Sequence, residues 1–208
     1  MILGWSLPLK FATIHDPSPR ASYLRAALED LNKFGHERLD PHLVAAKSGI
    51  SQDYDNQLNL ITDLVVLGFD ELAAIIGNIG DQHEHFEDRL HALVDSYLNF
   101  AIAQPRLLAL MFNYKAQLET QPPVTVKESG DQAFANIRQL LDGALKTKSF
   151  KSSDPAKIAI AIWSYLHGSA LNLLKQRHTA PLEEHVINEH YRKLSGLLTR
   201  DLVSLKAH

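Results

Sequence analysis

The sequence predicts an all-α protein, in which a small three-helix module is joined to a larger helical bundle, with about nine helices in all. Apolar residues recur every three to four positions along most of the chain, and no stretch shows the strict alternation of a half-buried strand. The composition, with 45% hydrophobic and 22% charged residues over 208 positions, is that of a globular chain long enough to bury a core.

Residues 1–18 form an apolar arm in front of the first helix. Pro8 and Lys10 interrupt the arm, which is shorter than the roughly 20 apolar residues of a membrane-spanning helix. No basic region precedes its apolar run, so a signal peptide is not expected. We expect the arm to pack on the body of the protein. The alternative is an arm that binds a partner or inserts into a surface.

Three short helices are expected in the module, residues 19–58. The first covers residues 20–34 and ends at Gly35. Its apolar face consists of Leu24, Ala27, Leu28, Leu31 and Phe34. The second begins at Asp40-Pro41, because an aspartate can cap the free backbone amides and proline suits the first helical position. Ser51 is a suitable N-cap for the third.

Longer helices are expected beyond residue 58, where glycines, prolines and polar clusters separate apolar stretches. Their expected ranges are 58–77, 84–104, 105–119, 126–146, 155–175 and 183–205, with a turn at 78–81. The chain then divides into an arm (1–18), a module (19–58) and a helical domain (59–208). The second boundary falls inside a continuous helix.

The charged and reactive residues exclude several function classes. A formal net charge of −3 argues against general coating of nucleic acid. The absence of cysteine excludes disulfides, thiol nucleophiles and cysteine-ligated zinc, and it suits the reducing cytoplasm in which we expect the protein. No phosphate-binding glycine loop, nucleophile elbow or zinc-protease motif is present, so we expect neither an enzyme nor a bound cofactor.

One histidine-rich segment has the spacing of a metal site. His83, Glu87 and His91 lie at i, i+4 and i+8, with His85 nearby. The expected helix begins only at Glu84, however, and charged residues crowd the segment, as on a solvated helix face. We therefore expect no metal there.

The segment from Ala26 to Ser51 consists of a helix, a loop, a short helix and a glycine-containing turn, the order in which helix-turn-helix proteins introduce a recognition helix. It resembles the start of a TetR/AcrR-family DNA-binding domain, without a gap. The matching positions are Ala26-Ala27-Leu28, Gly35, Asp40, Val44-Ala45 and Ser48-Gly49-Ile50-Ser51.

Two further stretches resemble one C-terminal subclass of the same family. Trp163, His167 and Gly168 match the Trp-x-x-x-His-Gly signature that names this subclass, and residues 99–112 resemble its Tyr/Phe-Ala…Pro…Leu-Met-Phe stretch. The matches cover most of the chain in the right order. The resemblance implies an all-helical homodimer that holds a ligand in its larger domain and binds operator DNA through its smaller one.

The chain departs from the family pattern after Ser51. When Gly68-Phe69 is aligned with the family's Gly-Phe, about five residues are missing, and Asp53 and Asp55 stand where family members carry basic residues. Residues 1–60 contain six basic and seven acidic side chains. A DNA-binding domain normally has the opposite balance.

If the module binds DNA, side-chain chemistry indicates the contacts. Amide and phenol groups pair with base edges, whereas Lys and Ser side chains bind phosphates. The expected base contacts are Gln52, Tyr54, Asn56 and Gln57, and the expected phosphate contacts are Lys47 and Ser51. The alternative is a degenerate helix that only packs.

Trp163 and His167 lie four residues apart, on one face of a helix. Either they fill the core, with His167 bound to a buried carbonyl and Gly168 allowing close helix approach, or they line a ligand cavity. An apolar cavity on the middle helices would select a hydrophobic or aromatic small molecule. Its expected lining is Phe100, Met111, Phe112, Tyr114, Phe134, Trp163 and His167.

Two hypotheses remain open. In the first, the protein is a ligand-responsive transcription regulator that binds operator DNA as a homodimer, paired through its last two helices, about 155–177 and 183–205. The apolar stripes expected at that interface are Ile158, Ile162, Leu166 and Leu173, and Ile187, Tyr191, Leu194 and Leu198. In the second, it is a dimeric small-molecule or lipid-binding protein whose degenerate helix-turn-helix no longer binds DNA.

Overall fold

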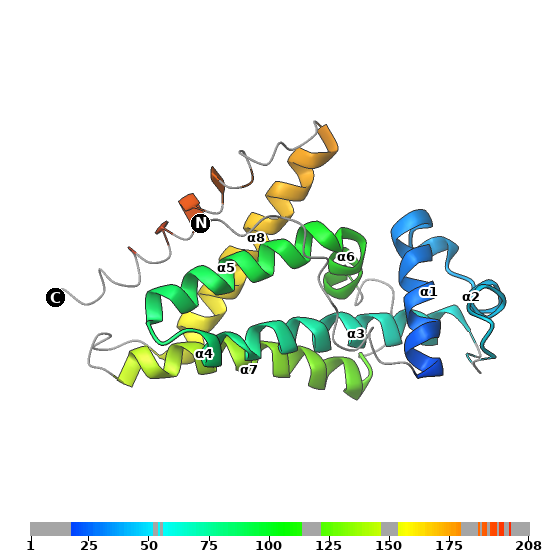
Figure 1. The fold of residues 1–208 in the computed structure, drawn as a ribbon, viewed down its shortest axis with the longest axis horizontal. Helices are drawn as coiled ribbons and strands as arrows, with labels where there is room; N and C mark the ends of the chain where they lie inside the picture. Colours follow the sequence, from blue (N-terminus) through cyan, green and yellow to red (C-terminus); the bar gives the residue numbers. More distant parts are fainter. Residues whose placement is uncertain are drawn as a thin grey trace. The chain divides into compact units, whose positions relative to one another are not determined.

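The computed structural model of the chain describes residues 18–51, 54, 56–113, 122–146 and 154–179 (Figure 1). Beyond residue 179 it describes residues 187, 189–190, 192–194, 196–197 and 200. Every regular element in these ranges is helical, which confirms the all-α prediction. The elements are α1 (Pro19–Phe34), the 3₁₀ turn η2 (His36–Arg38), α2 (Pro41–Ser48), α3 (Gln57–Gly77), α4 (Ile79–Gln82), α5 (Phe86–Ala103), α6 (Pro105–Asn113), α7 (Val124–Lys146) and α8 (Pro155–Thr179). The N-terminal arm lies outside the described residues.

The first two helices end where the local sequence predicts. Gly35 follows α1 with φ +89° and Gly49 follows α2 with φ +69°, values that glycine adopts without steric strain. Asp40 caps α2, because its Oδ1 accepts hydrogen bonds from the backbone N–H groups of His42 at 2.8 Å and Leu43 at 3.4 Å. The first half of the module therefore follows the prediction.

The third helix of the module is not found: no described residue between Ser48 and Gln57 is helical. α3 begins directly at Gln57, and Asn56 caps it by accepting a hydrogen bond from the Asn59 N–H at 3.0 Å. Only residues 49–56 connect α2 to α3. Two helical turns take about seven residues, so this connection has no room for a recognition helix with a turn on either side. No described residue bears out the third helix of the prediction.

Two smaller predictions are wrong. The segment expected as a turn contains the short helix α4, whose Ile79 is buried and anchors it. Phe34, expected on the buried face of α1, is 44% exposed, and the Lys33 ammonium lies 4.9 Å from the centroid of its ring. A residue in the last turn of a helix can continue the apolar period and still lie beyond the neighbouring helices.

The helices form two compact units, which we describe separately. The first holds residues 1–71 and 103–130 and the second residues 72–102 and 131–208, so α3 and α7 each contribute to both. In the first unit, four residues of the face predicted for α1 are buried: Leu24, Ala27, Leu28 and Leu31. The domain limits expected near residues 18 and 58 stay a prediction.

The core of the second unit includes the inner face of α5. Five apolar residues of this face are buried: Leu90, Leu93, Val94, Tyr97 and Ala101. Asn136 of α7 donates a hydrogen bond from Nδ2 to the Ala73 carbonyl of α3 at 2.7 Å, which ties these two helices together in this unit. No helix in the described ranges is both long and apolar enough to cross a membrane.

α8 does not offer the stripe predicted for a dimer interface. Ile158, Ile162, Leu166 and Leu173 are exposed by only 9%, 2%, 0% and 1%. They are therefore part of the chain's own core. The apolar residues that α8 does expose are Ile160 (55%) and Leu171 (46%). Between them in sequence lies Gly168, and a Cβ built there would meet no described atom within 4 Å.

The last predicted helix is described only in part. Its described residues between 187 and 200 are helical, and Ile187 and Leu194 are buried. Tyr191 and Leu198, which complete the predicted stripe, lie outside the described residues.

Gly68 lets α3 and α6 pack closely in the first unit. A Cβ at this position would lie 2.5 Å from Met111 Sδ and 3.2 Å from Leu107 Cγ, both closer than van der Waals contact. At Gly130 of α7, by contrast, a Cβ would meet the Phe69 ring at an ordinary 3.9 Å.

We predict that Gly68→Ala lowers the free energy of unfolding by about 1–3 kcal/mol, because the added methyl group overpacks this contact. Urea denaturation monitored by circular dichroism measures the change. The matched control, Gly130→Ala, removes a flexible helical glycine without crowding and should be neutral or stabilising by up to about 1 kcal/mol. Equal stability of the two variants would contradict the close contact at Gly68.

Candidate functional site

Tyr54, a predicted base contact, is held against the N-terminal module. Its ring stacks on that of Tyr23, with centroids 5.0 Å apart and an interplanar angle of 21°. Its hydroxyl donates to Asp63 Oδ2 at 2.6 Å, and burial together with this bond raises the pKa of Tyr54. Arg20 Nη2 binds the same oxygen at 2.8 Å. Tyr54 therefore fastens the connection after α2 to the starts of α1 and α3.

Gln57, another predicted base contact, is bound to the backbone of the module. Its Nε2 donates to the carbonyls of His36 at 2.9 Å and Leu39 at 2.8 Å, which uses both amide hydrogens. Asn56 caps α3. The two amides thus already serve the local structure, and their predicted contacts to bases stay a prediction.

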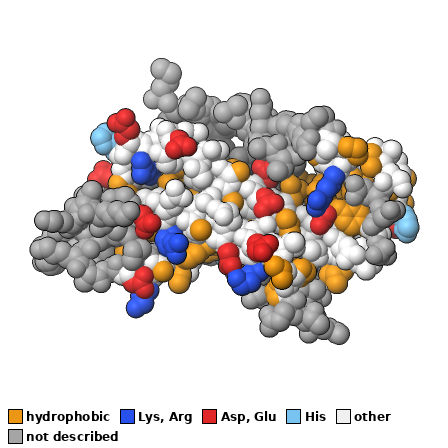
Figure 2. Space-filling model, turned by 90° about the horizontal axis from the view of Figure 1, so that it is seen from below, with side chains coloured by type: hydrophobic (Ala, Val, Ile, Leu, Met, Phe, Trp, Pro, Cys, Tyr) orange, Lys and Arg blue, Asp and Glu red, His pale blue; other side chains and the backbone are white. Residues whose placement is uncertain are grey.

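Lys47, a predicted phosphate contact, is paired with two carboxylates of α1. Its Nζ lies 2.8 Å from Glu29 Oε2 and 2.9 Å from Asp30 Oδ1. The hydrogen bonds to Glu29 and Asp30 raise the pKa of Lys47, so the ammonium is charged, but its charge is already compensated. Ser51 is exposed, and Gln52 lies outside the described residues. Figure 2 shows acidic and basic side chains interspersed over one face of the molecule.

Four positions predicted for a ligand cavity lie in the second unit, and three of them, Phe134, Trp163 and His167, form an aromatic cluster with Tyr97. The Tyr97 hydroxyl and His167 Nδ1 are 3.0 Å apart and share a hydrogen bond. The Trp163 ring packs edge-on against Tyr97, with centroids 6.3 Å apart, and against Phe134, with centroids 6.0 Å apart. Phe100 is fully buried. Burial lowers the pKa of His167, so the imidazole is neutral at pH 7.

Two other predicted lining residues lie in the first unit. Met111 approaches Gly68, and Phe112 packs edge-on against Phe69 with centroids 5.8 Å apart. Tyr114 lies outside the described residues. The predicted set thus falls in both units, and its described members make core contacts; its role in binding a ligand stays a prediction.

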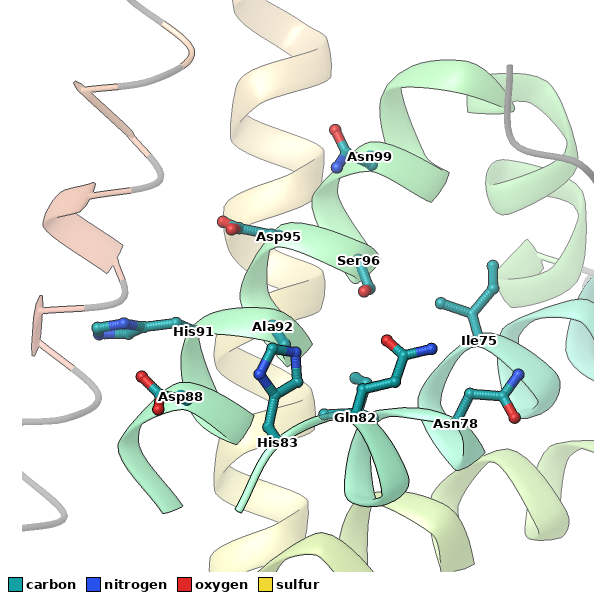
Figure 3. Close-up of a pocket in the computed structure, with 11 residues that line it drawn as sticks. Ile75, Asn78, Gln82, His83, Asp88, His91, Ala92, Asp95, Ser96 and Asn99 are labelled. Atoms are coloured by element: carbon teal, nitrogen blue, oxygen red, sulfur yellow. The ribbon is translucent and has the colours of Figure 1, made fainter. Parts of the chain in front are cut away.

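A pocket of about 520 Å³ lies elsewhere in the second unit, between the end of α3, α4 and the outer face of α5. It is lined by Ile75, Asn78, Ile79, Gln82, His83, Asp88, His91, Ala92, Asp95, Ser96 and Asn99. In Figure 3, Asp88, His91 and Asp95 extend to the same side of α5, and Gln82 and His83 lie below Ser96. None of the predicted ligand contacts is among these residues.

Arg89 links the two helices next to this pocket. Its Nε donates to the His83 carbonyl at 2.7 Å and its Nη2 to the Gly80 carbonyl at 3.3 Å, which ties the α4 segment to α5. Asp95 is exposed as a whole, yet the pocket wall desolvates its carboxyl group enough to raise the pKa of Asp95, while the positive charge of His91 acts in the opposite direction.

The pocket includes residues that sequence reasoning had considered only for a metal. His83 and His91 both line it, but no group of three or more His, Cys, Asp or Glu side chains in the described part of the chain is placed to hold a metal ion. The only trace of the pocket in the sequence of α5 is a polar stripe that continues past the first turn to Asp95 and Asn99, and such a stripe is equally typical of a solvated helix face.

Comparisons with known proteins define the class of this fold. Residues 90–190 match the family model described as "Tetracyclin repressor-like, C-terminal domain". A protein with unknown function from Rhodococcus sp. RHA1 is 26% identical, with a TM-score of 0.76 over 91% of this chain and 97% of that one. No curated protein matches the chain in sequence.

Two named regulators share the fold at lower identity. A regulatory protein of the tetR family, also from Rhodococcus RHA1, has a TM-score of 0.62 at 13% identity, over 91% of this chain and 97% of that one. The reduced form of E. coli NemR has a TM-score of 0.68 at 12% identity, over 92% of this chain and the whole of that one. The chain thus has the fold of helical transcription regulators.

More particularly, residues 90–190 match a tetracycline-repressor-like C-terminal domain, and the chain shares its fold with TetR-family regulators. The family resemblance predicted from the sequence is confirmed. The Trp163–Gly168 signature of the subclass stays a prediction.

We predict that His167 makes the protein less stable in mild acid. The pKa of His167 in the folded protein lies below the ordinary value of about 6.5. As the pH falls below 6.5, the imidazole is therefore protonated in the unfolded chain before it is protonated in the folded protein. The free energy of unfolding consequently decreases as the pH is lowered from 7 to 5. In His167→Gln this loss, at most about 1 kcal/mol because the ring is only half-buried, should disappear. Thermal melts of both proteins at pH 7 and pH 5 measure it, and equal slopes would contradict the prediction.

Proposed function

We propose that this chain is a ligand-responsive, homodimeric protein of the TetR regulator class whose N-terminal module no longer reads operator DNA through a recognition helix. The observation that carries the proposal is the connection between α2 and α3, residues 49–56, in which no described residue is helical. The regulator fold supports ligand-responsive regulation in the cytoplasm, without enzymatic activity.

The charges of the module support the same proposal. A helix-turn-helix domain approaches phosphates with unpaired cations, and each phosphate contact releases counterions. Here Lys47 is compensated by Glu29 and Asp30, and Arg20 is compensated by Asp63. Breaking these pairs to reach a phosphate would expose carboxylates to the DNA backbone, which repels them.

The second candidate is an operator-binding transcription regulator. The fold shared with regulators favours it, and so does α2, which keeps its cap and ends at a left-handed glycine as a helix-turn-helix does. In this case Lys47, Ser51, Gln52, Tyr54, Asn56 and Gln57 would form the DNA contact.

We expect no saturable binding of the full chain to labelled duplexes, either of random sequence or from its own upstream region, in fluorescence anisotropy at 50 mM salt. Counterion release makes low salt the most favourable condition for any phosphate contact, so absence of binding there is decisive. Binding to the upstream duplex that falls steeply between 50 and 200 mM salt, and whose salt slope drops by about one in Lys47→Ala, would establish the second candidate instead.

The dimer is proposed to form through the outer face of α8. Ile160, Ser164, Gly168 and Leu171 follow one another at helical spacing, and the two apolar members are 55% and 46% exposed. Small residues at the middle positions let a second helix approach closely. A two-fold axis would place the same face of another copy against it.

We expect the protein to be a dimer in size-exclusion chromatography with light scattering, and Ile160→Glu with Leu171→Glu to convert it to a monomer that keeps its helical circular dichroism. At a two-fold interface each substitution is present in both copies, so the glutamates introduced at both positions would be buried without a compensating cation. The matched control is Val124→Glu on α7, at a side chain that is 69% exposed; this variant should stay dimeric. A double variant that remains a dimer would refute this interface.

A further inference from the structure

The pocket between α4 and the outer face of α5 has the dimensions of a ligand site. Its volume of about 520 Å³ lies within the range of small-molecule pockets, roughly 300–1,000 Å³. All of its lining residues belong to the second compact unit. It is separate from the aromatic cluster of Tyr97, because α5 contributes Tyr97 from its buried face and Asp95 from its exposed face.

The chemistry of the lining favours a cation. The lining contains two carboxylates, Asp88 and Asp95, and two imidazoles, His83 and His91, but neither lysine nor arginine. The neighbouring cation, Arg89, is bound to the carbonyls of Gly80 and His83. An anionic ligand would therefore meet two carboxylates without a lysine or arginine in the lining to compensate them.

The lining also offers hydrogen-bond acceptors and an apolar strip. Asn78 occupies the N-cap position of α4, but its side chain makes no capping hydrogen bond and is left for the pocket. Gln82 and Ser96 lie nearby (Figure 3). Ile75 and Ile79 contribute aliphatic surface. A ligand that fits combines an ammonium group with an aliphatic body.

The spacing of the carboxylates sets the length of the ligand. Asp88 and Asp95 are seven residues apart on α5, which corresponds to two helical turns and a rise of about 10.5 Å. Figure 3 shows both side chains on the same side of the helix. Two ammonium groups separated by an extended aliphatic chain of that length would reach both carboxylates at once.

We propose that this pocket binds an extended organic cation, namely an aliphatic diamine whose two ammonium groups pair with Asp88 and Asp95. The proposal goes beyond the proposed function, because it concerns a binding site on the outer face of α5 and holds whether or not the N-terminal module binds DNA.

Isothermal titration calorimetry of the full chain with three eight-carbon probes tests the chemistry. The probes are 1,8-diaminooctane, its neutral counterpart 1,8-octanediol and the dianion suberate. We expect saturable binding of the diamine below about 1 mM, at least about ten-fold weaker binding of the diol, and none of suberate. Equal binding of diol and diamine, preference for suberate, or no saturable diamine binding below about 1 mM would each overturn the proposal.

Matched variants test the location. Asp95→Asn and Asp88→Asn keep the side-chain shape and should each weaken diamine binding about ten-fold, the effect of losing one charge-assisted contact. The control is Asp81→Asn, which removes the same charge from an exposed position of α4 that does not line the pocket and should leave the affinity within about two-fold. Equal losses in all three variants would mean general attraction to a negative surface and would overturn the site. Melting temperatures confirm that the variants fold, and no DNA is used, so the result is independent of the anisotropy test.

Discussion

The short connection between α2 and α3 is the constraint on which the N-terminal module depends. Residues 49–56 join two helices that are both tied to α1, and the side chains of Tyr54 and Asn56 in this connection are bound inside the module. Tyr54 binds Asp63, and Gln57 binds carbonyls at η2. Each bond satisfies a partly buried group that has lost its contact with water. These hydrogen bonds are made within the module, at the position where a helix-turn-helix protein presents its recognition helix to DNA.

α1 is held at its other end by α6. Arg106 Nη1 donates to the Leu31 carbonyl at 3.2 Å, and Asn32 Nδ2 donates to Gln104 Oε1 at 2.8 Å. The Leu31 carbonyl also accepts the Gly35 N–H at 3.0 Å, and the C-terminal end of a helix carries partial negative charge, so a guanidinium is a favourable second partner there. The first unit is therefore stabilised at both ends of α1, and this stability does not require a recognition helix.

What could be predicted from the sequence depended on the range of the interaction. Gly35 and Asp40 act on the adjacent backbone, so their caps were predictable, and the deficit after Ser51 was visible as a count of residues. The face of α8 was not predictable, because the spacing of Ile162 and its neighbours is the same whether they contact their own chain or another. The pocket was missed for a similar reason: a polar stripe on α5 does not reveal whether it faces bulk water or a concave wall.

The two carboxylates of the pocket have different physical reasons to be there. Asp88 lies in the first turn of α5, where the partial positive charge of the helix terminus stabilises it. Asp95 lies two turns further on, beyond that field, and burial raises its pKa, which means that its charged form is disfavoured in the free protein. A cation bound beside it would reverse that effect. An asparagine at position 95 would remove both the desolvation penalty of the carboxylate and its attraction to a bound cation. The charge of Asp95 thus gives the pocket its preference for cations and slightly lowers the stability of the protein when no ligand is bound.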